Sequence, residues 1–444
     1  MENLKYASTE FFVPLPEDQI AEEVQANPLP GPAMTQEERL RQALDHPVGS
    51  PPLEEIVHPG ETVCVVLSDV TRRWQHTEVY LPLLIQRLNR AGIPDRDICL
   101  ISATGTHRAQ TEEEHRALLG EELSRRFTLL DHDCDDRANL KYMGATRRGT
   151  PVWLNARAMA CDRLILTGGV VYHFLAGFGG GRKSVIPGIA GRETINTNHA
   201  NAMNEGEGTG RSPLVGSGRL EGNPFHEDLM EAAAMARPDF LLNVVADDDQ
   251  QIVGAFAGDW VKAHESAVEF VRELFGVRVS RRVPLVLASA GGAPKDINLY
   301  QSSKTLVNAL EMVAPGGTIV MLSQCPEGVG SADCEELLCG YDSLAERETA
   351  LRKHFTIGGY MGYLYEESAQ RYNLVVVSEL DPARFSRTSL HIVPTLEDAL
   401  ELASDWFGGS LDGVDTALMP HGASTFPIQP ADPYPGRCAN HYRA

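Results

Sequence analysis

DRLILTGG at residues 162–169 is followed, after three intervening residues, by HFLAGFGGGRKSVIPGIAGRETINTNHA at residues 173–200. The first segment is a continuous apolar run ending in two glycines, which is typical of a strand buried on both faces of a parallel sheet. The second holds a lysine within a glycine run, with a histidine on either side. Backbone N–H groups and an ammonium group in such a segment bind anions. These residues therefore predict an α/β fold with a ligand site beyond the carboxyl end of this strand.

Apolar strands and amphipathic helices alternate on both sides of this segment. The predicted strands are 62–68, 97–104, 126–132, 162–169, 240–247, 283–289, 316–323 and 372–380. The predicted helices are 76–92, 111–120, 226–236, 259–276, 303–314, 346–355 and 395–403. Because buried strands that alternate with helices form parallel sheets, we expect mainly parallel sheets. The first sixty residues are rich in proline, glutamate and glutamine, and we expect an extended arm with one short helix there.

A second α/β unit begins at VSRRVPLVLASAGG (279–292), where two arginines and a proline precede a buried strand. A chain of 444 residues also exceeds what one hydrophobic core usually holds. We therefore predict two α/β domains with an active-site cleft between them. The cofactor-binding and catalytic domain is 1–277 and the second domain is 278–405; in this interpretation the tail at 406–444 packs back on the first domain.

The composition excludes several classes of function. Hydrophobic residues make up 43% and charged residues 23% of the chain, as in ordinary globular proteins. A formal net charge of -22 argues against binding to nucleic acid, whose phosphates require a basic surface. No apolar run is long enough to span a bilayer, and the first residues lack the features of a signal peptide. We expect a cytoplasmic protein with no membrane or nucleic-acid partner.

The eight cysteines are scattered along the chain, and no pair has CxxC spacing. They are Cys64, Cys99, Cys134, Cys161, Cys325, Cys334, Cys339 and Cys438. This spacing predicts reduced thiols, most of them ordinary core residues, and argues against a zinc cluster.

Polar clusters follow the ends of four predicted strands. They are Asp69, Arg72 and Arg73 after 62–68; His107 after 97–104; His173, Lys183 and His199 after 162–169; and Tyr300, Gln301 and Lys304 after 283–289. Because ligands of open α/β sheets bind at the carboxyl ends of strands, four such ends are a stronger signal than any one cluster. Each cluster alone also has a structural explanation: His107 can cap a helix, Asp69 can pair with Arg72, and Tyr300 can begin a helix.

The glycine run nearly matches the P-loop pattern GxxxxGK(S/T), counted from Gly177 to Ser184. Arg182, however, stands where the pattern has its last glycine, and Pro187 follows too soon for the helix that a P-loop needs. Both departures weigh against a nucleotide-hydrolysing loop. A P-loop-like phosphotransferase that binds phosphate through Lys183 stays the alternative from a different enzyme class.

With these motifs in place, the chain resembles the nickel-dependent lactate racemase family, whose members racemise or epimerise 2-hydroxy acids. The matching motifs, in the family's order, are DVTR (69–72), GTHR (105–108), HFLAGFGGGRKSVIPG (173–188), TNHA (197–200) and PKDINLYQSSK (294–304). The stretch from 173 to 200 is highly specific. The resemblance implies an isomerase that carries a nickel pincer nucleotide, a pyridinium mononucleotide that grips Ni²⁺ through two sulfur-containing substituents and a ring carbon.

The resemblance also implies roles for the matching residues. His199 would be the protein ligand of nickel, and His107 and His173 would be the acid/base pair. The implied cofactor-binding residues are Lys183, which would hold the cofactor covalently, Asp69, Arg72, Gly179, Gly180, Gly181 and Arg182; the implied substrate-binding residues are Arg73, Tyr300, Gln301 and Lys304. Two histidines are required because racemisation in both directions needs a proton acceptor on each side of the substrate.

The identity of the 2-hydroxy acid is left open by the aromatic residues around the motifs. Tyr172 precedes His173, and GGYMGYLY contains Tyr360 and Tyr363 where lactate racemases tend to have a bulky aromatic residue. Such a pocket suits lactate or a larger acid such as a sugar acid. The implied partners are this substrate and the enzymes that synthesise the cofactor. A non-catalytic homologue that only binds the cofactor is the second alternative, and the presence of both histidines counts against it.

Overall fold

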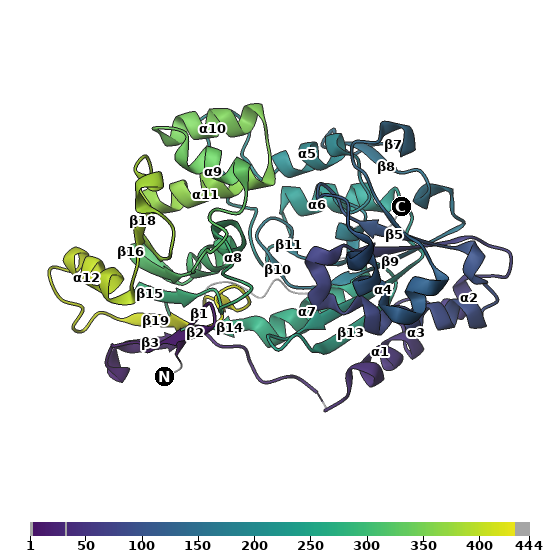
Figure 1. Cartoon of the computed structure of the whole chain (residues 1–444), viewed down its shortest axis with the longest axis horizontal. Coiled ribbons are helices and arrows are strands. Elements are labelled where there is room, and N and C mark those ends of the chain that lie inside the picture. Colours follow the sequence, from purple (N-terminus) through teal and green to yellow (C-terminus); the bar gives the residue numbers. More distant parts are fainter. Residues whose placement is uncertain (1–2, 32, 431–444) are drawn as a thin grey trace. The chain divides into compact units, whose positions relative to one another are not determined.

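The computed structural model describes residues 3–31 and 33–430 (Figure 1). The chain forms two compact units whose segments are interleaved in the sequence. The C-terminal unit contains the chain up to Pro28, Met203–Ser212 and the segment from Leu274 onward. The glycine-loop unit contains Leu29–Ala202 and Pro213–Glu273, and thus the glycine run. The predicted domain limits at 277 and 405 stay predictions; the end of the predicted tail, 431–444 with Cys438, lies outside the described residues.

The C-terminal unit is built on a six-stranded parallel sheet of order β18-β17-β16-β15-β19-β3. Its strands are β3 (Ile20–Glu23), β15 (Val283–Ser289), β16 (Val313–Leu322), β17 (Asn373–Val377), β18 (His391–Val393) and β19 (Thr416–Met419). Its helices are α8 (Leu299–Ala309), α9 (Ala332–Cys339), α10 (Leu344–Lys353), α11 (Ile357–Arg371) and α12 (Leu396–Trp406). Two short pairs complete it: β1 (Leu4–Tyr6) with β2 (Thr9–Phe11), and β14 (Gly276–Arg278) with β20 (Phe426–Ile428).

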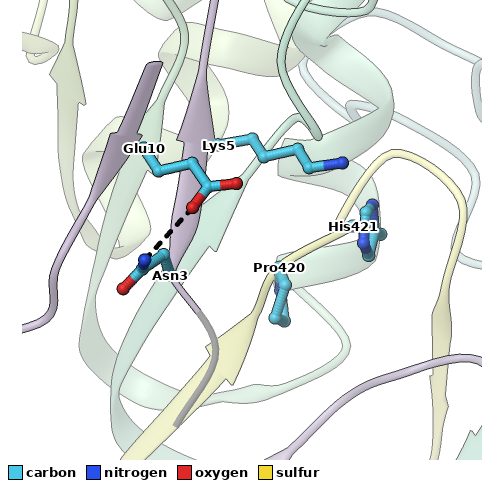
Figure 2. A pocket seen from close by; sticks show the side chains of 5 residues that line it. All are labelled: Asn3, Lys5, Glu10, Pro420 and His421. Carbon is cyan, nitrogen blue, oxygen red and sulfur yellow. Dashed lines mark hydrogen bonds between the residues drawn. The ribbon is translucent and has the colours of Figure 1, made fainter. Parts of the chain in front are cut away.

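A pocket of about 280 Å³ lies beside the β1–β2 hairpin, where Asn3 Nδ2 donates to Glu10 Oε2 at 3.1 Å (Figure 2). Its lining residues are Asn3, Lys5, Glu10, Pro420 and His421. The residues that the sequence singled out do not line this pocket. It therefore belongs to the packing of the hairpin against the turn after β19.

The glycine-loop unit is built on a second six-stranded sheet, of order β13-β12-β9-β4-β5-β6, in which β13 alone runs antiparallel to its neighbour. Its strands are β4 (Val63–Ser68), β5 (Ile98–Ala103), β6 (Leu129–Asp131), β9 (Arg163–Gly169), β12 (Phe240–Ala246) and β13 (Ile252–Gly258). Its helices are α1 (Gln36–Asp45), α2 (Leu53–Ile56), α3 (Thr77–Arg90), α4 (Glu112–Arg126), α5 (Arg192–Ala200), α6 (Pro224–Ala234) and α7 (Lys262–Phe275). Two hairpins lie outside the sheet: β7 (Leu140–Ala145) with β8 (Pro151–Asn155), and β10 (Tyr172–His173) with β11 (Gly177–Phe178).

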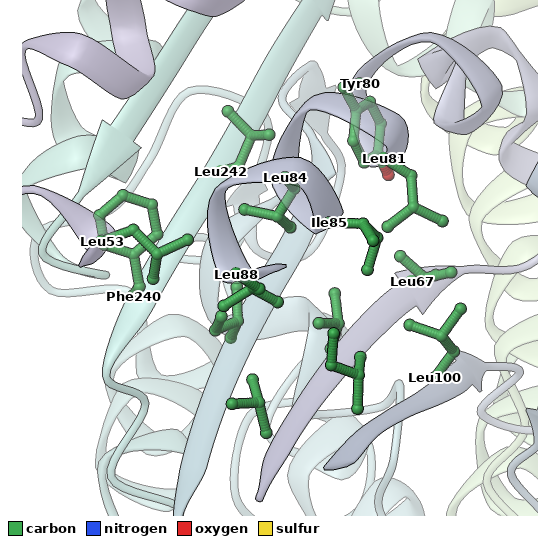
Figure 3. Packing of buried hydrophobic residues seen from close by; sticks show 14 of the residues in the cluster. Leu53, Leu67, Tyr80, Leu81, Leu84, Ile85, Leu88, Leu100, Phe240 and Leu242 are labelled. Atoms are coloured by element: carbon green, nitrogen blue, oxygen red, sulfur yellow. The ribbon is translucent and has the colours of Figure 1, made fainter. Parts of the chain in front are cut away.

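Helix α3 covers one face of this sheet (Figure 3). Leu81, Leu84, Ile85 and Leu88 repeat at the spacing of one helical face and are fully buried. They form one hydrophobic cluster with strand residues such as Leu67 of β4. Complete burial of a leucine or isoleucine side chain contributes about 1.5–3 kcal/mol. This cluster fixes the orientation of the strands whose ends carry the predicted site residues.

The predicted fold class, α/β with mainly parallel sheets, is confirmed, and the central strands begin and end within a few residues of their predicted limits. The prediction for the first sixty residues is wrong in part, because they form strands β1, β2 and β3 and helices α1 and α2. Strand β3 has the sequence IAEE and pairs with β19 at the edge of the sheet. Charged side chains remain hydrated on an edge strand, which is why its sequence does not look like a buried strand.

Helices α9 and α11 are not predicted by the sequence pattern. Helix α11 contains Gly358, Gly359 and Gly362, and glycine is unfavourable inside a helix by about 1 kcal/mol. A Cβ at Gly362 would lie 2.5 Å from the carbonyl oxygen of Cys334 in α9. Close packing of the two helices therefore requires the glycine and outweighs its low propensity. Among the described residues, no helix has both the length and the apolar character needed to cross a membrane.

Candidate functional site

Three of the predicted clusters lie at neighbouring strand ends in the glycine-loop unit. Strands β9, β4 and β5 are adjacent and parallel, so their carboxyl ends share one edge of the sheet. After β4, Asp69 leads into the 3-10 helix η2 (Val70–Gln75), and His107 follows β5. The lysine of the glycine run lies in a second 3-10 turn, η6 (Gly181–Ser184), which follows β9 and the β10–β11 hairpin.

His107 is hydrogen-bonded to a buried carboxylate. Its Nδ1 lies 2.6 Å from Asp69 Oδ2, and Thr71 Oγ1 donates to Asp69 Oδ1 at 2.7 Å. Burial by itself would raise the pKa of Asp69, but the hydrogen bond and charge of His107, with the Thr71 hydroxyl and Arg72, bring this pKa below its ordinary value. Ionised Asp69 accepts Nδ1–H and leaves Nε2 of a neutral His107 as a proton acceptor. The His107 side chain is 44% exposed, so Nε2 is accessible.

His173 has very different surroundings. The backbone N–H groups of Leu175 and Ala176 donate to its Nδ1 at 3.1 and 3.2 Å. Its Nε2 lies 2.6 Å from Lys183 Nζ. Burial, followed by the charges of Lys183, Arg72 and Arg182, holds the pKa of His173 well below its ordinary value. His173 is therefore held neutral, and because Nδ1 accepts two N–H groups, the proton of the neutral ring lies on Nε2, which faces Lys183 Nζ.

The same cations act on Lys183. Burial, followed by the charges of Arg72 and Arg182, holds the pKa of the Lys183 ammonium well below its ordinary value. Arg72 is exposed and its Nη1 donates to Thr71 Oγ1 at 3.0 Å. Arg73, beside it, is also exposed. The unprotonated amine that this environment favours is the nucleophilic form of lysine.

Arg182 is fully buried behind the glycine run. Its guanidinium donates to the carbonyl oxygen of Ala176 at 2.7 Å and lies 2.8 Å from His264 Nε2 and 3.1 Å from His226 Nδ1. It also donates to Gly179 O at 3.3 Å. Burial lowers the pKa of Arg182 to about 9. The guanidinium thus points into the protein and ties the glycine run to α6 and α7, where His226 and His264 lie.

The glycines of the run are required by packing. A Cβ at Gly181, whose φ is +53°, would lie 2.8 Å from the His264 ring. A Cβ at Gly180 would lie 2.6 Å from Val170. The N–H of Gly181 donates to Asn243 Oδ1 at 3.0 Å, and that of Gly179 to the carbonyl oxygen of Val171 at 2.8 Å. The predicted contact of these glycines with a cofactor stays a prediction, to which the structure adds a packing role.

His199 lies in α5 and is buried. Its Nδ1 is 2.7 Å from the carbonyl oxygen of Ile195, and its ring packs edge-on against Phe225. Because Nδ1–H donates to this carbonyl, Nε2 of the neutral ring carries the lone pair. Burial, followed by the charge of Lys183, lowers the pKa of His199 to about 3. The ring is therefore neutral, as metal binding requires.

The residues predicted to contact substrate from the second domain lie in the C-terminal unit. Tyr300, Gln301 and Lys304 belong to the first turns of α8, where Asn298 caps the helix by accepting from the N–H of Gln301 at 2.9 Å. Tyr360 and Tyr363 lie in α11 and are 2% and 1% exposed. The Tyr363 hydroxyl donates to Glu348 Oε2 at 3.4 Å. Both tyrosines are thus packed within their own unit.

The resemblance to a P-loop does not extend to the backbone. In a P-loop the lysine stands at the start of a helix whose N-terminal amides bind phosphate. Here the first α-helix after Lys183 is α5, which begins at Arg192. The Lys183 Nζ contacts His173, and Ser184 Oγ donates to the carbonyl oxygen of Thr167 at 2.5 Å. A phosphate cradle of the P-loop type is therefore not formed by these residues.

Sequence reasoning missed His226, His264 and Asn243, which support the glycine run from α6, α7 and β12. Each is buried and each contacts Arg182 or a glycine of the run. No local motif surrounds them, and they follow Lys183 by between 43 and 81 residues in the sequence. The available signal was a physical one: a buried arginine in a run without acidic residues needs acceptors from elsewhere in the fold.

Comparison with known proteins identifies relatives of both parts of the chain. The family model of the lactate racemase N-terminal domain matches residues 6–210, and that of the lactate racemase C-terminal domain matches residues 279–426. The lactate racemase of Lactiplantibacillus plantarum is 32% identical over 375 residues, which are 83% of this chain and 86% of that protein. The lactate racemase of Thermoanaerobacterium thermosaccharolyticum is 34% identical over 297 residues, 67% of this chain and 68% of that protein.

Solved structures agree with these sequence matches. The lactate racemase apoprotein from Thermoanaerobacterium thermosaccharolyticum superposes with a TM-score of 0.87 at 26% identity, covering 96% of this chain and 99% of that one. A structural genomics target from Thermotoga maritima superposes with a TM-score of 0.63 at 18% identity, covering 88% of this chain and 98% of that one. The second likeness concerns the fold alone.

Proposed function

The chain belongs to the lactate racemase family and is an isomerase, and from this premise we propose that it inverts the C2 centre of lactate or of a larger 2-hydroxy acid. The proposal includes a nickel pincer nucleotide held by Lys183 and His199, with His107 and His173 as the acid/base pair. The observation that carries it is the placement of His107, His173 and Lys183 after strands of one sheet edge, with the opposed surroundings of the two histidines and with His199 of α5 within the electrostatic influence of Lys183.

The residues present fit the cofactor chemically. An amine whose pKa is depressed by burial and neighbouring cations suits covalent attachment, and Lys183 has one. A neutral imidazole whose Nδ1–H donates to a carbonyl suits nickel ligation through Nε2, and His199 has this arrangement. When bound, the nickel pincer nucleotide held by Lys183 and His199 would supply a reversible acceptor for the hydride of C2. The remaining chemistry, which is proton transfer at the C2 oxygen, falls to the chain.

The two histidines divide that proton transfer. In one direction one histidine accepts the hydroxyl proton, and the other histidine, protonated, gives a proton back to the oxygen after the centre inverts. In the reverse direction the roles are exchanged. Asp69 balances a positive charge on His107, whereas Lys183 and Arg72 oppose one on His173. We therefore propose that the two histidines have different roles, with His107 supported by a carboxylate and His173 held neutral by burial and cations.

The substrate carboxylate needs a cationic partner. Arg72 and Arg73 are exposed in η2, next to His107 on the same sheet edge. Arginine binds carboxylates through two parallel hydrogen bonds, which orients the acid as well as attracting it. We propose that Arg73 receives the carboxylate of the 2-hydroxy acid.

The decisive experiment is mass and metal analysis of protein produced together with the cofactor-synthesis enzymes. Wild type is expected to carry a covalent mass increment and about one nickel per chain, and Lys183→Ala to lose the increment. His107→Ala and His173→Ala are expected to keep the increment and to lose racemisation of the preferred 2-hydroxy acid by at least about 10²-fold. An unmodified Lys183 in the wild type under these conditions would overturn the proposal.

A matched control is available in the same unit. His115 Nε2 lies 2.9 Å from Asp131 Oδ1, so this pair resembles His107 and Asp69 in chemistry but lies outside the motifs. His115→Ala is expected to keep both the mass increment and the racemase rate. Loss of activity in His115→Ala equal to that in His107→Ala would show that the assay reports folding rather than acid/base chemistry.

A further inference from the structure

Three cysteines that are far apart in the sequence meet at the edge of the glycine-loop sheet opposite the candidate site. Cys64 in β4 and Cys99 in β5 are partners in the parallel strand pairing. Cys161 precedes β9 by one residue, and β9 pairs with β4 through Arg163 and Val63. All three therefore lie at the amino ends of neighbouring strands, whereas Asp69 and His107 follow the carboxyl ends.

The strand pairing gives the first two cysteines a disulfide-compatible spacing. Partner residues on neighbouring strands place their side chains on the same face of the sheet, with the strands about 4.8 Å apart. A disulfide joins Cα atoms that are about 4.4–6.8 Å apart. Cys64 and Cys99 face each other in the pairing of β4 with β5. Bond formation between Cys64 and Cys99 therefore requires no movement of the backbone beyond local adjustment.

The three thiols differ in access and in electrostatic environment. Cys64 is fully buried, whereas Cys99 and Cys161 are partly exposed. The hydrogen bond from Cys64, with the charge of Arg157 and against the effect of burial, lowers the pKa of the Cys99 thiol to about 7. Hydrogen bonds to Cys161 and Cys99, with burial, raise the pKa of Cys64. Cys64 also lowers the pKa of Cys161. It is the strand pairing with Cys64 that assigns the nucleophile to Cys99 and the proton donor to Cys64.

We propose that Cys99 and Cys64 form a peroxide-sensitive dithiol, with Cys99 as the oxidised thiolate and Cys64 as the resolving thiol. A hydroperoxide is the two-electron oxidant. The Cys99 thiolate attacks the peroxide O–O bond, giving a sulfenic acid and releasing hydroxide or an alkoxide. The Cys64 thiol then attacks the sulfenic sulfur, and the S–OH oxygen leaves as water with the thiol proton. The product is a disulfide between β4 and β5.

This inference is independent of the racemase reaction. The dithiol lies at the other end of the strands from His107 and Lys183, and the disulfide would join positions that are already partners in the sheet. Its chemical basis is the one that redox-sensing cysteines share, namely a low thiol pKa, partial exposure and a neighbouring resolving thiol. The expected readout is therefore the state of the thiols, measured directly.

The test is peroxide treatment of the reduced full-length protein, followed by blocking of the remaining thiols and peptide mass spectrometry. We expect a Cys64–Cys99 disulfide and loss of two of the eight thiols. Before oxidation, at pH 7, Cys99 should react with an alkylating reagent at least about ten-fold faster than Cys134, because only thiolates react and burial raises the pKa of Cys134. Cys99 alkylating no faster than Cys134 would overturn the proposal.

Three variants identify the partners. Cys99→Ser should abolish the disulfide, and Cys161→Ser should keep it. Cys64→Ala should stop at a Cys99 sulfenic acid, which a cyclic 1,3-dione captures. A disulfide that contains Cys161 as the main product in the wild type would contradict the assignment of Cys64 as the resolving thiol. Because that result is read in the wild-type protein, it holds even if the substitution of buried Cys64 prevents folding.

Discussion

His107 and His173 follow β5 and β9, the two strands that flank β4 in one sheet, but they have opposite electrostatic surroundings. Asp69, a buried carboxylate, lies 2.6 Å from Nδ1 of His107. Around His173 the neighbours are Lys183, Arg72 and Arg182, and Nδ1 accepts two backbone hydrogen bonds. The difference shows that the two members of a proposed acid/base pair are not interchangeable. One can share its positive charge with a carboxylate, and the other is held neutral by burial and cations.

The largest loss of activity is expected when the carboxylate beside His107 is removed. In Asp69→Asn the amide cannot balance a positive ring, and its NH₂ group can donate to Nδ1, so that the proton of a neutral ring moves to Nε2. The Nε2 lone pair is then lost. We expect kcat to fall by about 10²–10⁴-fold. Steady-state rates of the cofactor-loaded variant in both directions measure this.

The control for this substitution is Asp131→Asn. Asp131 accepts from Gln110 and lies 2.9 Å from Nε2 of His115, so the control removes a carboxylate of the same kind from the same unit. Its kcat should stay within about three-fold of wild type. A similar loss of kcat in both variants would mean that Asp69 supports the fold and not the proton state of His107.

A second prediction concerns the glycine run, which positions Lys183 next to His173. In Gly181→Ala the new methyl group would lie 2.8 Å from the His264 ring at a φ of +53°. Overpacking and the left-handed backbone together should lower the free energy of unfolding by about 2–4 kcal/mol. Chemical denaturation of the cofactor-free protein measures this value.

Gly208→Ala separates the two causes. Gly208 also has a positive φ, +75°, but a Cβ there meets nothing within 4 Å. Only the backbone cost of about 1–2 kcal/mol should appear. If both variants lose the same stability, the contact with His264 is not what requires glycine at position 181.

The fold could be predicted from the sequence where local pattern and tertiary packing agree. The central strands of both sheets are buried on both faces. VCVVLS of β4 and LILTGG of β9 are therefore continuous apolar runs, and such runs predict buried strands from the sequence alone. The same agreement is missing in α11, whose glycines are explained only by the neighbouring helix α9. Strand β3 is polar because it lies at an edge, and its partner β19 is almost four hundred residues away.

The candidate site also contains residues that the sequence predicts and residues that it does not. His107, His173 and Lys183 could be found because each follows a predictable strand, and strand ends are where α/β sheets bind ligands. The partners of Arg182 could not, since His226 and His264 come from helices whose sequences carry no chemical motif. The cysteine spacing likewise predicted isolated core thiols, whereas the strand pairing makes Cys64 and Cys99 neighbours. Register across a parallel sheet is a long-range property that residue spacing does not encode.

The smallest expected effect is a change in the pH dependence of stability that His173 causes. In the cofactor-free protein His173 stays neutral when folded, while an unfolded histidine is protonated below its ordinary pKa of about 6.5. The unfolded state then binds more protons, so the free energy of unfolding falls as the pH drops, by up to about 1.4 kcal/mol per pH unit for this one group. Lys183→Met removes the positive charge that the ammonium form of Lys183 places next to Nε2. The pKa of His173 should rise, although burial still keeps it below its ordinary value.

The pH dependence of this variant has a definite sign. As the pH falls, His173 lowers the free energy of unfolding only until the folded ring is itself protonated. If the pKa of the folded ring is higher in the variant, this decrease stops at a higher pH. The free energy of unfolding therefore falls less between pH 7 and pH 5 than in wild type. Lys141→Met, at an exposed position of β7, should keep the wild-type dependence. Denaturation at the two pH values, with a histidine NMR titration, measures both quantities; an unchanged His173 pKa in Lys183→Met would mean that burial alone holds the ring neutral.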